Sequence, residues 1–178
     1  CGAMFRAKQW PKVLMVTLSS MNVVKMFTVT GAEIAEITPL PPLVRKRGKR
    51  RRIREHAHGT SLWPTCLAVS REYLFVSQYK VWGVVVMRWS AELQTFEYAY
   101  TITDEEIKCT EGLHISQDGS SLWVACAYLG HILRFDRSGD GNGGHVWAKS
   151  RVPAMSLPET LSPWNIIGHD GRLFIAAH

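Results

Sequence analysis

The stretch DGSSLWVACAYLGHILRFDRSG, residues 118–139, has the pattern of a β-hairpin. Asp118-Gly119 is a turn signal, and the apolar run Leu122–Ala127 follows it. A short break leads to a second apolar run, Ile132–Phe135, and the chain then reaches another glycine. The fold depends on whether this hairpin stands alone or is one copy of a repeat.

The hairpin pattern recurs along the chain. Each copy has an apolar run, a short break and a second run that ends near an aromatic residue. The further copies are Val13–Gly31, Tyr73–Ser90 and a copy that begins at Asp170–His178. The leucines at the same place in the four apolar runs are Leu14, Leu74, Leu122 and Leu173, at spacings of 60, 48 and 51 residues. On this alignment Phe135 is matched by Phe27 and Trp89.

Additional short strands extend each copy to a unit of four. First strands are expected within Met4–Trp10, Thr65–Ser70, Gly112–Ser116 and Trp164–His169. Fourth strands are expected at Ala32–Ile37, Thr95–Ile102 and His145–Val152. Four short antiparallel strands that recur about every 40–50 residues are typical of the blades of a β-propeller.

The apolar runs also favour stacked sheets. In Leu122–Ala127 and in Leu173–Ala177 both alternating sets of side chains are apolar, as expected for strands that are covered on both faces. A β-sandwich is the alternative, but it gives no reason for near-equal repeats. We therefore predict an all-β chain, a β-propeller of four-stranded antiparallel blades that is incomplete at about three and a half blades.

Residues 1–178 are expected to form a single partial propeller domain. Blade 1 spans about residues 4–40, a basic insertion follows at 41–59, blade 2 spans about 60–103, blade 3 about 108–153, and blade 4 begins at about 160–178. An unclosed propeller exposes strand edges and apolar blade faces. We therefore expect this chain to be part of a longer protein or to be completed by another chain.

The composition indicates the class of protein and the cellular compartment. Hydrophobic residues make up 46% of the chain, enough for a globular core, and no apolar run approaches the roughly 18 residues that a membrane span needs. The four cysteines show no Cys-x-x-Cys spacing. Such sparse use of cysteine is typical of a reducing compartment and favours an intracellular location, cytoplasmic or nuclear.

The segment EGLHISQDGSSLWVACAYLGHILRFDRSG, residues 111–139, resembles the blade consensus of the NHL-repeat and senescence-marker-protein/gluconolactonase propellers. In both families a first strand of the type G-L-x-(V/I/W)-S-x-D-G leads to L-(Y/W)-V-A, and the third strand has the form I-x-R-F-D. The resemblance is good in units two and three and partial in units one and four. It implies a fold that usually has six blades and that hosts both binding proteins and enzymes.

The lactonase-like members of these families hold a divalent cation at the top of the channel through Glu, Asn and Asp side chains. Their Asn before Gly-Leu matches Glu111 here, and Asn165 is the other oxygen donor that aligns. Where both families commonly place an Asp in the second strand, this chain has Gln78, Cys126 and Ala177. A calcium or zinc ion at Glu111 and Asn165 is therefore expected only under the alternative of a metal-dependent lactonase, and no cofactor is expected otherwise.

The resemblance also implies a candidate binding face. In propellers of the usual arrangement, the loops between second and third strands share a face with the connections between blades. Aromatic side chains with polar tips on a rigid scaffold are typical contact residues. The candidates on this face are Tyr79, Lys80, Trp82, Tyr128 and His131.

The net charge of +6 comes from one segment, RKRGKRRRIR at residues 45–54, which has no acidic residue. Its eight basic residues are Arg45, Lys46, Arg47, Lys49, Arg50, Arg51, Arg52 and Arg54. Three interpretations stay open: a solvated loop, a nuclear-import signal, or contact with nucleic acid or another polyanion.

No pattern for nucleophilic catalysis is found in the sequence, because it lacks Gly-x-Ser-x-Gly and its seven histidines are scattered. No catalytic residue is therefore predicted. The main hypothesis is a non-enzymatic β-propeller that binds a protein or a polyanionic partner through one face. The alternative is a metal-dependent lactonase or hydrolase of the gluconolactonase type.

Overall fold

The structure is a computed structural model, which describes residues 2–5, 13–18, 23–28, 30–37, 64–70, 72–78, 83–139, 145–152 and 155–178. The first sheet contains β1 (Gly2–Phe5), β2 (Val13–Leu18), β3 (Val23–Thr28) and β4 (Glu33–Ile37), and the second contains β5 (Pro64–Val69), β6 (Tyr73–Gln78), β7 (Val84–Ser90) and β8 (Thr95–Ile102). The third contains β9 (Thr110–Ile115), β10 (Ser121–Cys126), β11 (His131–Gly139) and β12 (His145–Lys149), with the short β13 (Met155–Ser156) beside β11. The fourth contains β14 (Pro163–His169) and β15 (Arg172–Ala177). We call these sheets blades 1 to 4.

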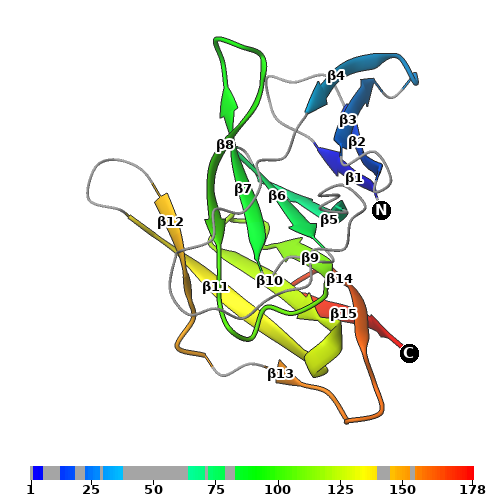
Figure 1. The fold of residues 1–178 in the computed structure, drawn as a ribbon, viewed down its shortest axis with the longest axis vertical. Helices are drawn as coiled ribbons and strands as arrows, with labels where there is room; N and C mark the ends of the chain where they lie inside the picture. The colour runs from blue at the N-terminus through cyan, green and yellow to red at the C-terminus, as the bar shows by residue number, and fades with distance from the viewer. Residues whose placement is uncertain are drawn as a thin grey trace, which may run out of the picture.

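The blades follow one another around the molecule in chain order (Figure 1). Within each complete blade the strands are antiparallel and lie in the order of the sequence. The first strands gather at the centre, because β1 contacts β5, β5 contacts β9 and β9 contacts β14. At the periphery β4 touches β8. This arrangement confirms the predicted propeller of four-stranded antiparallel blades, here with three complete sheets and the first two strands of a fourth.

The core consists of three apolar layers, each between two neighbouring blades. Leu74 and Val76 of β6 lie in the layer toward blade 1, whereas Phe75 between them lies in the layer toward blade 3. In β10, Leu122 likewise faces blade 2, and Ala125 faces blade 4. Both alternating sets of side chains are therefore buried because each strand has a neighbouring blade on either side. The sequence prediction of doubly covered strands is confirmed for β10. It is wrong for β15 as the structure describes it, where Phe174 is 54% exposed.

The strand registers place the repeated leucines at equivalent positions. Leu14 and Leu122 are each the second residue of the second strand, and they pair with Phe27 and Phe135 in the third strand. Leu74 pairs with Met87 rather than Trp89, so the match of Trp89 to Phe135 was wrong by two residues. Residues two apart in a strand share a face. An aromatic residue at position 89 therefore lies on the same face of the strand as position 87, which is the true equivalent of Phe135. Trp89 itself packs on Phe96, with ring centroids 5.2 Å apart.

Three elements differ in detail from the strands expected from the sequence. The first strand of blade 1 lies at Gly2–Phe5 and so begins two residues before the expected segment Met4–Trp10, which it overlaps at Met4 and Phe5. The fourth strand of blade 3 ends at Lys149, and β13 pairs instead with His131 and Ile132 at the beginning of β11. The outer edge of β11 is thus paired with two separate strands, β12 and β13. The second of these belongs to the connection to blade 4.

Helices play little part in the described segments of the chain. The described residues contain the short 3-10 helix η2 (Ala127–Leu129), and among them no helix has the length and apolar character needed to cross a membrane.

Candidate functional site

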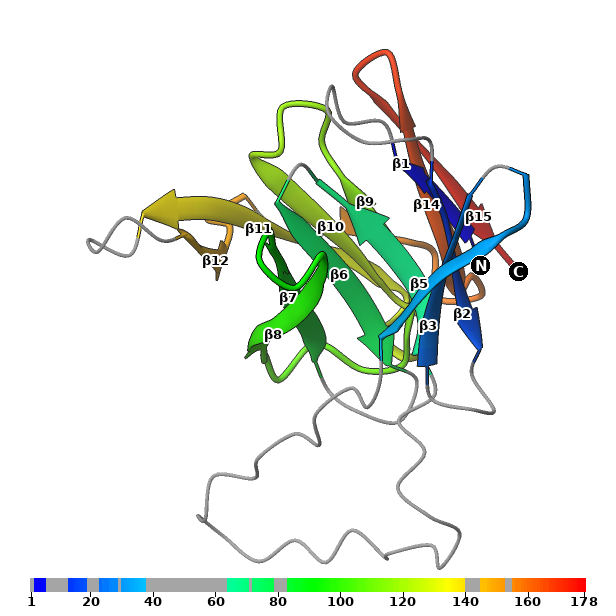
Figure 2. The ribbon, with the colours of Figure 1, turned by 90° about the horizontal axis from the view of Figure 1, so that it is seen from above.

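The antiparallel order gives each blade two distinct ends. The turn between the second and third strands lies at the same end as the chain that leads to the next blade, and we call this end the connection face. The turns between first and second strands lie at the opposite end, which we call the hairpin face. In Figure 2 the turns that follow β9 and β14 lie together at the hairpin face.

Most of the predicted contact residues fall outside the described part of the chain. These are Tyr79, Lys80, Trp82, Arg45, Lys46, Arg47, Lys49, Arg50, Arg51, Arg52 and Arg54. The predictions for these residues therefore stay predictions. The described candidates on the connection face are Tyr128 and His131.

Tyr128 projects from the connection face on a turn that the backbone holds in several places. The N–H of Ala127 donates to the Cys109 carbonyl at 3.1 Å, and the N–H of Leu157 donates to the Gly130 carbonyl at 2.9 Å. Gly130 ends η2 in the left-handed conformation, with φ at 67°, which a glycine adopts without strain. The Tyr128 side chain is 75% exposed at the top of this turn.

His131 lies differently from the sequence expectation that it projects from the connection face. As the first residue of β11 it pairs with Cys126 on one side and Ser156 on the other. The residue is only partly exposed, and its Nε2 atom is buried with no hydrogen-bond partner in the described structure. The imidazole therefore turns into the protein, and Tyr128 is the exposed member of the pair.

Apolar side chains from the connection between blades 3 and 4 accompany Tyr128, and sequence reasoning missed them. Met155 and Leu161 are both exposed. A Cβ placed on Gly130 would lie 3.4 Å from the Leu161 carbonyl oxygen, so this connection passes close to the Tyr128 turn. These residues lie in no periodic pattern. Only the tertiary path of the connection brings them to this face.

The inner strands of blades 2 and 3 are joined by polar contacts near the connection face. The Thr65 hydroxyl donates to the Thr110 carbonyl at 2.8 Å, and the Thr110 hydroxyl donates to the Gln78 carbonyl at 3.3 Å. The Gln78 side chain is fully buried, and both atoms of its amide are without a hydrogen-bond partner among the described residues. The register puts Gln78, Cys126 and Ala177 at matching places, opposite Pro64, Thr110 and Pro163 respectively.

Glu111 and Asn165 lie on neighbouring inner strands. A Cβ on Gly112 would lie 2.7 Å from the Asn165 Cα atom, so β9 and β14 approach closely because residue 112 is a glycine. Burial raises the pKa of the Glu111 carboxyl. The Asn165 Oδ1 atom accepts a hydrogen bond from the Ile166 N–H at 2.9 Å.

These donors do not fit a divalent cation. Calcium takes about six to eight oxygen ligands, whereas the described strands bring together two side-chain oxygen donors here. The third expected position is Cys126, where burial raises the pKa of the thiol to about 12. The described part of the chain contains no group of three or more His, Cys, Asp or Glu side chains arranged to hold a metal.

A cleft of about 800 Å³ lies at the hairpin face, between the β9–β10 turn and the β14–β15 turn. His114 on β9 lies in its wall, and the Gly168 N–H donates to His114 Nδ1 at 3.3 Å. The imidazole occupies the space that a Cβ on residue 168 would fill, so this close approach depends on a glycine there. Burial lowers the pKa of His114, which keeps Nδ1 free to accept this hydrogen bond.

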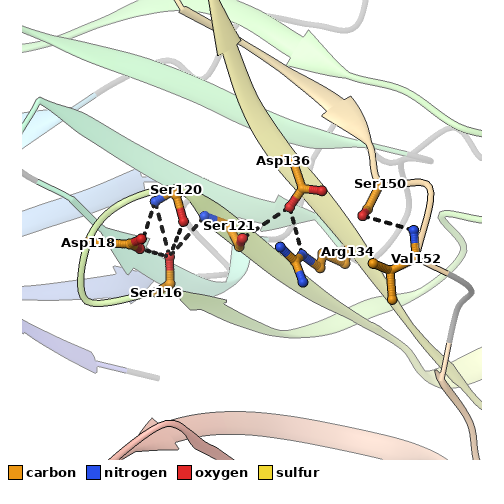
Figure 3. Close-up of polar contacts among 8 residues, drawn as sticks. All are labelled: Ser116, Asp118, Ser120, Ser121, Arg134, Asp136, Ser150 and Val152. Atoms are coloured by element: carbon orange, nitrogen blue, oxygen red, sulfur yellow. Dashed lines mark hydrogen bonds and ion pairs between the residues drawn. The ribbon is translucent and has the colours of Figure 1, made fainter.

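Polar side chains order the β9–β10 turn that borders the cleft (Figure 3). The Ser116 hydroxyl donates to Asp118 Oδ1 at 2.6 Å, and the Ser120 N–H donates to the same oxygen at 3.0 Å. These hydrogen bonds, from Ser116 first and then Ser120, lower the pKa of Asp118 to about 2. The Asp118 carboxylate thus stabilises the turn through these hydrogen bonds.

A second network lies on the face of blade 3 that looks toward blade 4 (Figure 3). Asp136 Oδ1 accepts hydrogen bonds from Arg134 Nε at 2.6 Å and from the Ser121 hydroxyl at 3.0 Å. The Arg134 guanidinium also lies over the Trp123 ring, 5.2 Å from its centroid. Asp136 therefore serves a structural network on this face of the sheet.

Comparison with solved structures shows where this arrangement of blades is found. The chain is similar to hydrazine synthase of Kuenenia stuttgartiensis (TM-score 0.56, 18% identity, covering 92% of this chain and 38% of that one). It is similar to a protein from Bacteroides fragilis described as a 6-phosphogluconolactonase (TM-score 0.62, 13% identity, 98% and 41%). It is also similar to the periplasmic gluconolactonase PpgL of Pseudomonas aeruginosa (TM-score 0.58, 14% identity, 99% and 46%).

The amino-acid sequence was also compared with known families and proteins. No protein-family model matches the sequence, and no curated protein sequence matches it. The chain spans about two fifths of the length of the solved structures that it matches. The expected resemblance to gluconolactonase-type propellers is therefore confirmed for the fold, and the chain has the structure of a partial β-propeller.

Proposed function

We propose that this chain is a non-enzymatic binding module that engages a protein partner through the connection face. The observation that carries the proposal is Tyr128, which is 75% exposed on a turn held by backbone hydrogen bonds on both sides. A tyrosine contributes a large contact area with few rotatable bonds, so ordering it on binding costs little entropy. Exposed aromatic residues on rigid scaffolds are frequent hot spots of protein interfaces.

The surroundings of Tyr128 support a protein partner. Met155 and Leu161 add exposed apolar surface from the connection between blades 3 and 4. Tyr128 itself is presented by a packed sheet, because η2 follows directly on β10, whose side chains are almost fully buried. A preformed apolar surface of this kind loses little free energy to ordering when a partner binds.

A second candidate is a polyanion bound by residues 45–54, and the density of charge in the sequence favours it. Eight cations and no acidic residue occur within this run. If all eight contacted phosphates, the slope of log K against log salt would be about −7 as an upper bound. Such binding would be independent of nucleic-acid sequence, since phosphate contacts carry no base information.

The lactonase alternative is the weaker proposal. It rests on Glu111 and Asn165, and the Asn165 oxygen already accepts a backbone hydrogen bond. Titration with calcium or zinc, followed by a lactone-opening assay, tests it directly. Saturable metal binding that Glu111→Gln abolishes, together with turnover, would favour this alternative over the binding module.

The proposed contact is tested by site-specific photo-crosslinking. A photoreactive phenylalanine analogue is placed at Tyr128, and as a matched control at Tyr98, which is 47% exposed on the outer strand β8. We expect one protein to be crosslinked from position 128 and not from position 98, and Leu161→Ala to weaken that crosslink. Equal crosslinking of the same proteins from both positions would contradict a specific connection face.

The polyanion candidate has its own measurement. Replacing Arg50, Arg51 and Arg52 by Gln should lower affinity for a single-stranded RNA and reduce the magnitude of the salt slope by about 2. An unchanged slope would remove the basic run from the mechanism.

A further inference from the structure

The cleft at the hairpin face has the size of a small-molecule site. It lies between the β9–β10 turn and the β14–β15 turn and has a volume of about 800 Å³. Its lining residues belong to the first and second strands of blades 3 and 4 and to the turns that join those strands. Small molecules generally bind in pockets of roughly 300–1,000 Å³. The cleft is therefore large enough for a ligand.

The side chains in its floor differ from their equivalents in blade 2. There, Ala68 of β5 is opposite Phe75 of β6, and both lie in the apolar core between blades 2 and 3. The matching residues of blade 3 are His114 of β9 and Trp123 of β10, which are opposite each other in the same way. Both are partly exposed and line the cleft. Blade 3 thus has two rings with polar atoms where blade 2 has an apolar core contact.

The neighbouring position in blade 3 is occupied by a small residue. The first residue of β6, Tyr73, is buried toward blade 3, and the Arg137 guanidinium lies 5.7 Å from the centroid of its ring. The first residue of β10 is Ser121, whose hydroxyl donates to Asp136. A serine is too small to fill the space that a tyrosine fills between blades 2 and 3. The sequence of blade 3 itself therefore favours a hollow at this position.

His114 offers the cleft a hydrogen-bond donor of defined identity. Its Nδ1 atom accepts the Gly168 N–H at 3.3 Å, so the proton of the neutral imidazole is on Nε2. Burial lowers the pKa of this imidazole, which favours the neutral form. Among the residues that the structure describes, none accepts a hydrogen bond from Nε2. This N–H is therefore available to a ligand.

Trp123 offers the cleft an apolar surface beside that donor. Its side chain packs against the core between blades 3 and 4, and the Arg134 guanidinium lies 5.2 Å from the centroid of its ring. The face of an aromatic ring is electron-rich and attracts weakly positive C–H groups. An indole ring next to a hydrogen-bond donor therefore suits a ligand that has both a C–H face and hydroxyl groups.

The charged side chains around the cleft favour an uncharged ligand. Asp118 and Asp170 bring one carboxylate to each of the two turns, and Arg172 brings a cation. The His169 Nε2 atom lies 3.3 Å from Asp170 Oδ2. An anion would approach two carboxylates, and a cation would approach Arg172, so that either would meet a like charge.

We propose that this cleft binds a pyranose unit of an uncharged carbohydrate, with Trp123 packed on the C–H face of the sugar ring and His114 Nε2–H donating to one of its hydroxyl oxygens. The cleft lies at the opposite end of the blades from Tyr128 and Glu111. The inference therefore goes beyond the proposed function and does not depend on it.

The test uses the 178-residue chain and the methyl pyranosides of glucose, galactose, mannose and N-acetylglucosamine. Backbone amide shifts are followed by NMR as each sugar is added. We expect saturable shifts with at least one sugar, centred on residues 114–118 and 168–173, and a dissociation constant in the millimolar range that is usual for so small a ligand. The absence of saturable shifts with all four sugars, or shifts centred on Tyr128, would overturn the proposal.

Charged sugars test the choice of an uncharged ligand. Glucuronate and glucosamine have the same ring with one negative or one positive charge. We expect each to bind no more tightly than the methyl glycosides, because each meets a like charge at the rim of the cleft. Tighter binding of either one would overturn the assignment of an uncharged sugar.

Substitutions in the floor of the cleft test the two contacts. Trp123→Ala should weaken binding about tenfold, and Trp123→Phe should weaken it less because an aromatic ring remains. His114→Phe should also weaken binding, since it keeps a ring but removes the N–H donor. Tyr128→Ala is the control and should leave the affinity unchanged. Unchanged affinity in both Trp123→Phe and His114→Phe would overturn the proposal, even if Trp123→Ala fails to fold.

Discussion

Two glycines set how closely blade 4 approaches blade 3. Gly112 admits the backbone of Asn165, and Gly168 admits the ring of His114. Both contacts lie between β9 and β14, the inner strands of the two blades. A side chain at either position would occupy space that the neighbouring strand already fills.

The substitution Gly168→Ala tests the contact with His114. The added methyl group collides with the imidazole, so we expect a loss of about 1–3 kcal/mol in the free energy of unfolding, as for other overpacked sites. Gly139→Ala is the control, because no atom lies within 4 Å of a Cβ there. Urea denaturation measures both, and equal effects of the two substitutions would contradict the close approach.

His114 also makes stability depend on pH in a defined direction. Its pKa is lowered in the folded chain, because burial disfavours the charged ring. The unfolded chain therefore binds the proton at a higher pH than the folded chain does. The contribution of His114 is complete above the ordinary pKa near 6.5 and is lost as the pH falls from there toward the folded pKa.

Thermal unfolding between pH 5 and pH 8 measures this contribution. His114→Gln should flatten the decline in the melting temperature below about pH 6.5. His169→Gln serves as the control, because His169 is an exposed imidazole at the neighbouring turn. A decline that persists unchanged in His114→Gln would show that other groups are responsible.

At the scale of the element, strands were predicted well where the apolar pattern was periodic. Thr95–Ile102 matches β8 at both ends, and the alternating pattern of β10 matches its burial on two faces. Trp89 was misplaced because residues 87 and 89 share one face of β7, so periodicity alone does not distinguish them. Met155–Ser156 was missed because two residues carry no pattern, and β13 exists only through its pairing with β11.

Leu122 and Leu173 occupy equivalent positions in β10 and β15, but Leu122 is fully buried and Leu173 is partly exposed. The two leucines should therefore contribute differently to stability. Leu122→Ala empties a site fully buried between blades 2 and 3, so we expect a loss of about 2–5 kcal/mol in the free energy of unfolding. Leu173→Ala should cost less, because the Leu173 side chain is partly exposed. Denaturant titration of the two variants ranks them, and the reverse order would contradict the assignment of the layers.

At the scale of the whole molecule, the sequence repeat was enough to predict the fold, but it identified only part of the candidate site. The spacing of the leucines predicted the order of the sheets, and it also placed Tyr128 on the connection face. The spacing did not predict Met155, Leu161 or the cleft beside His114. Those features depend on how far neighbouring blades diverge and on the path of the connection, which are tertiary properties with no periodic signature in the sequence.

The central claim is that each blade is a rotated copy of the one before it, and an experimental structure tests it most directly. The rotation that superposes β5–β8 on β9–β12 should also superpose β1–β4 on β5–β8 and β9–β10 on β14–β15. It should bring the Cα atoms of Leu14, Leu74, Leu122 and Leu173 onto one another. Two sheets packed face to face as a sandwich, with these leucines at unrelated positions, would contradict the account.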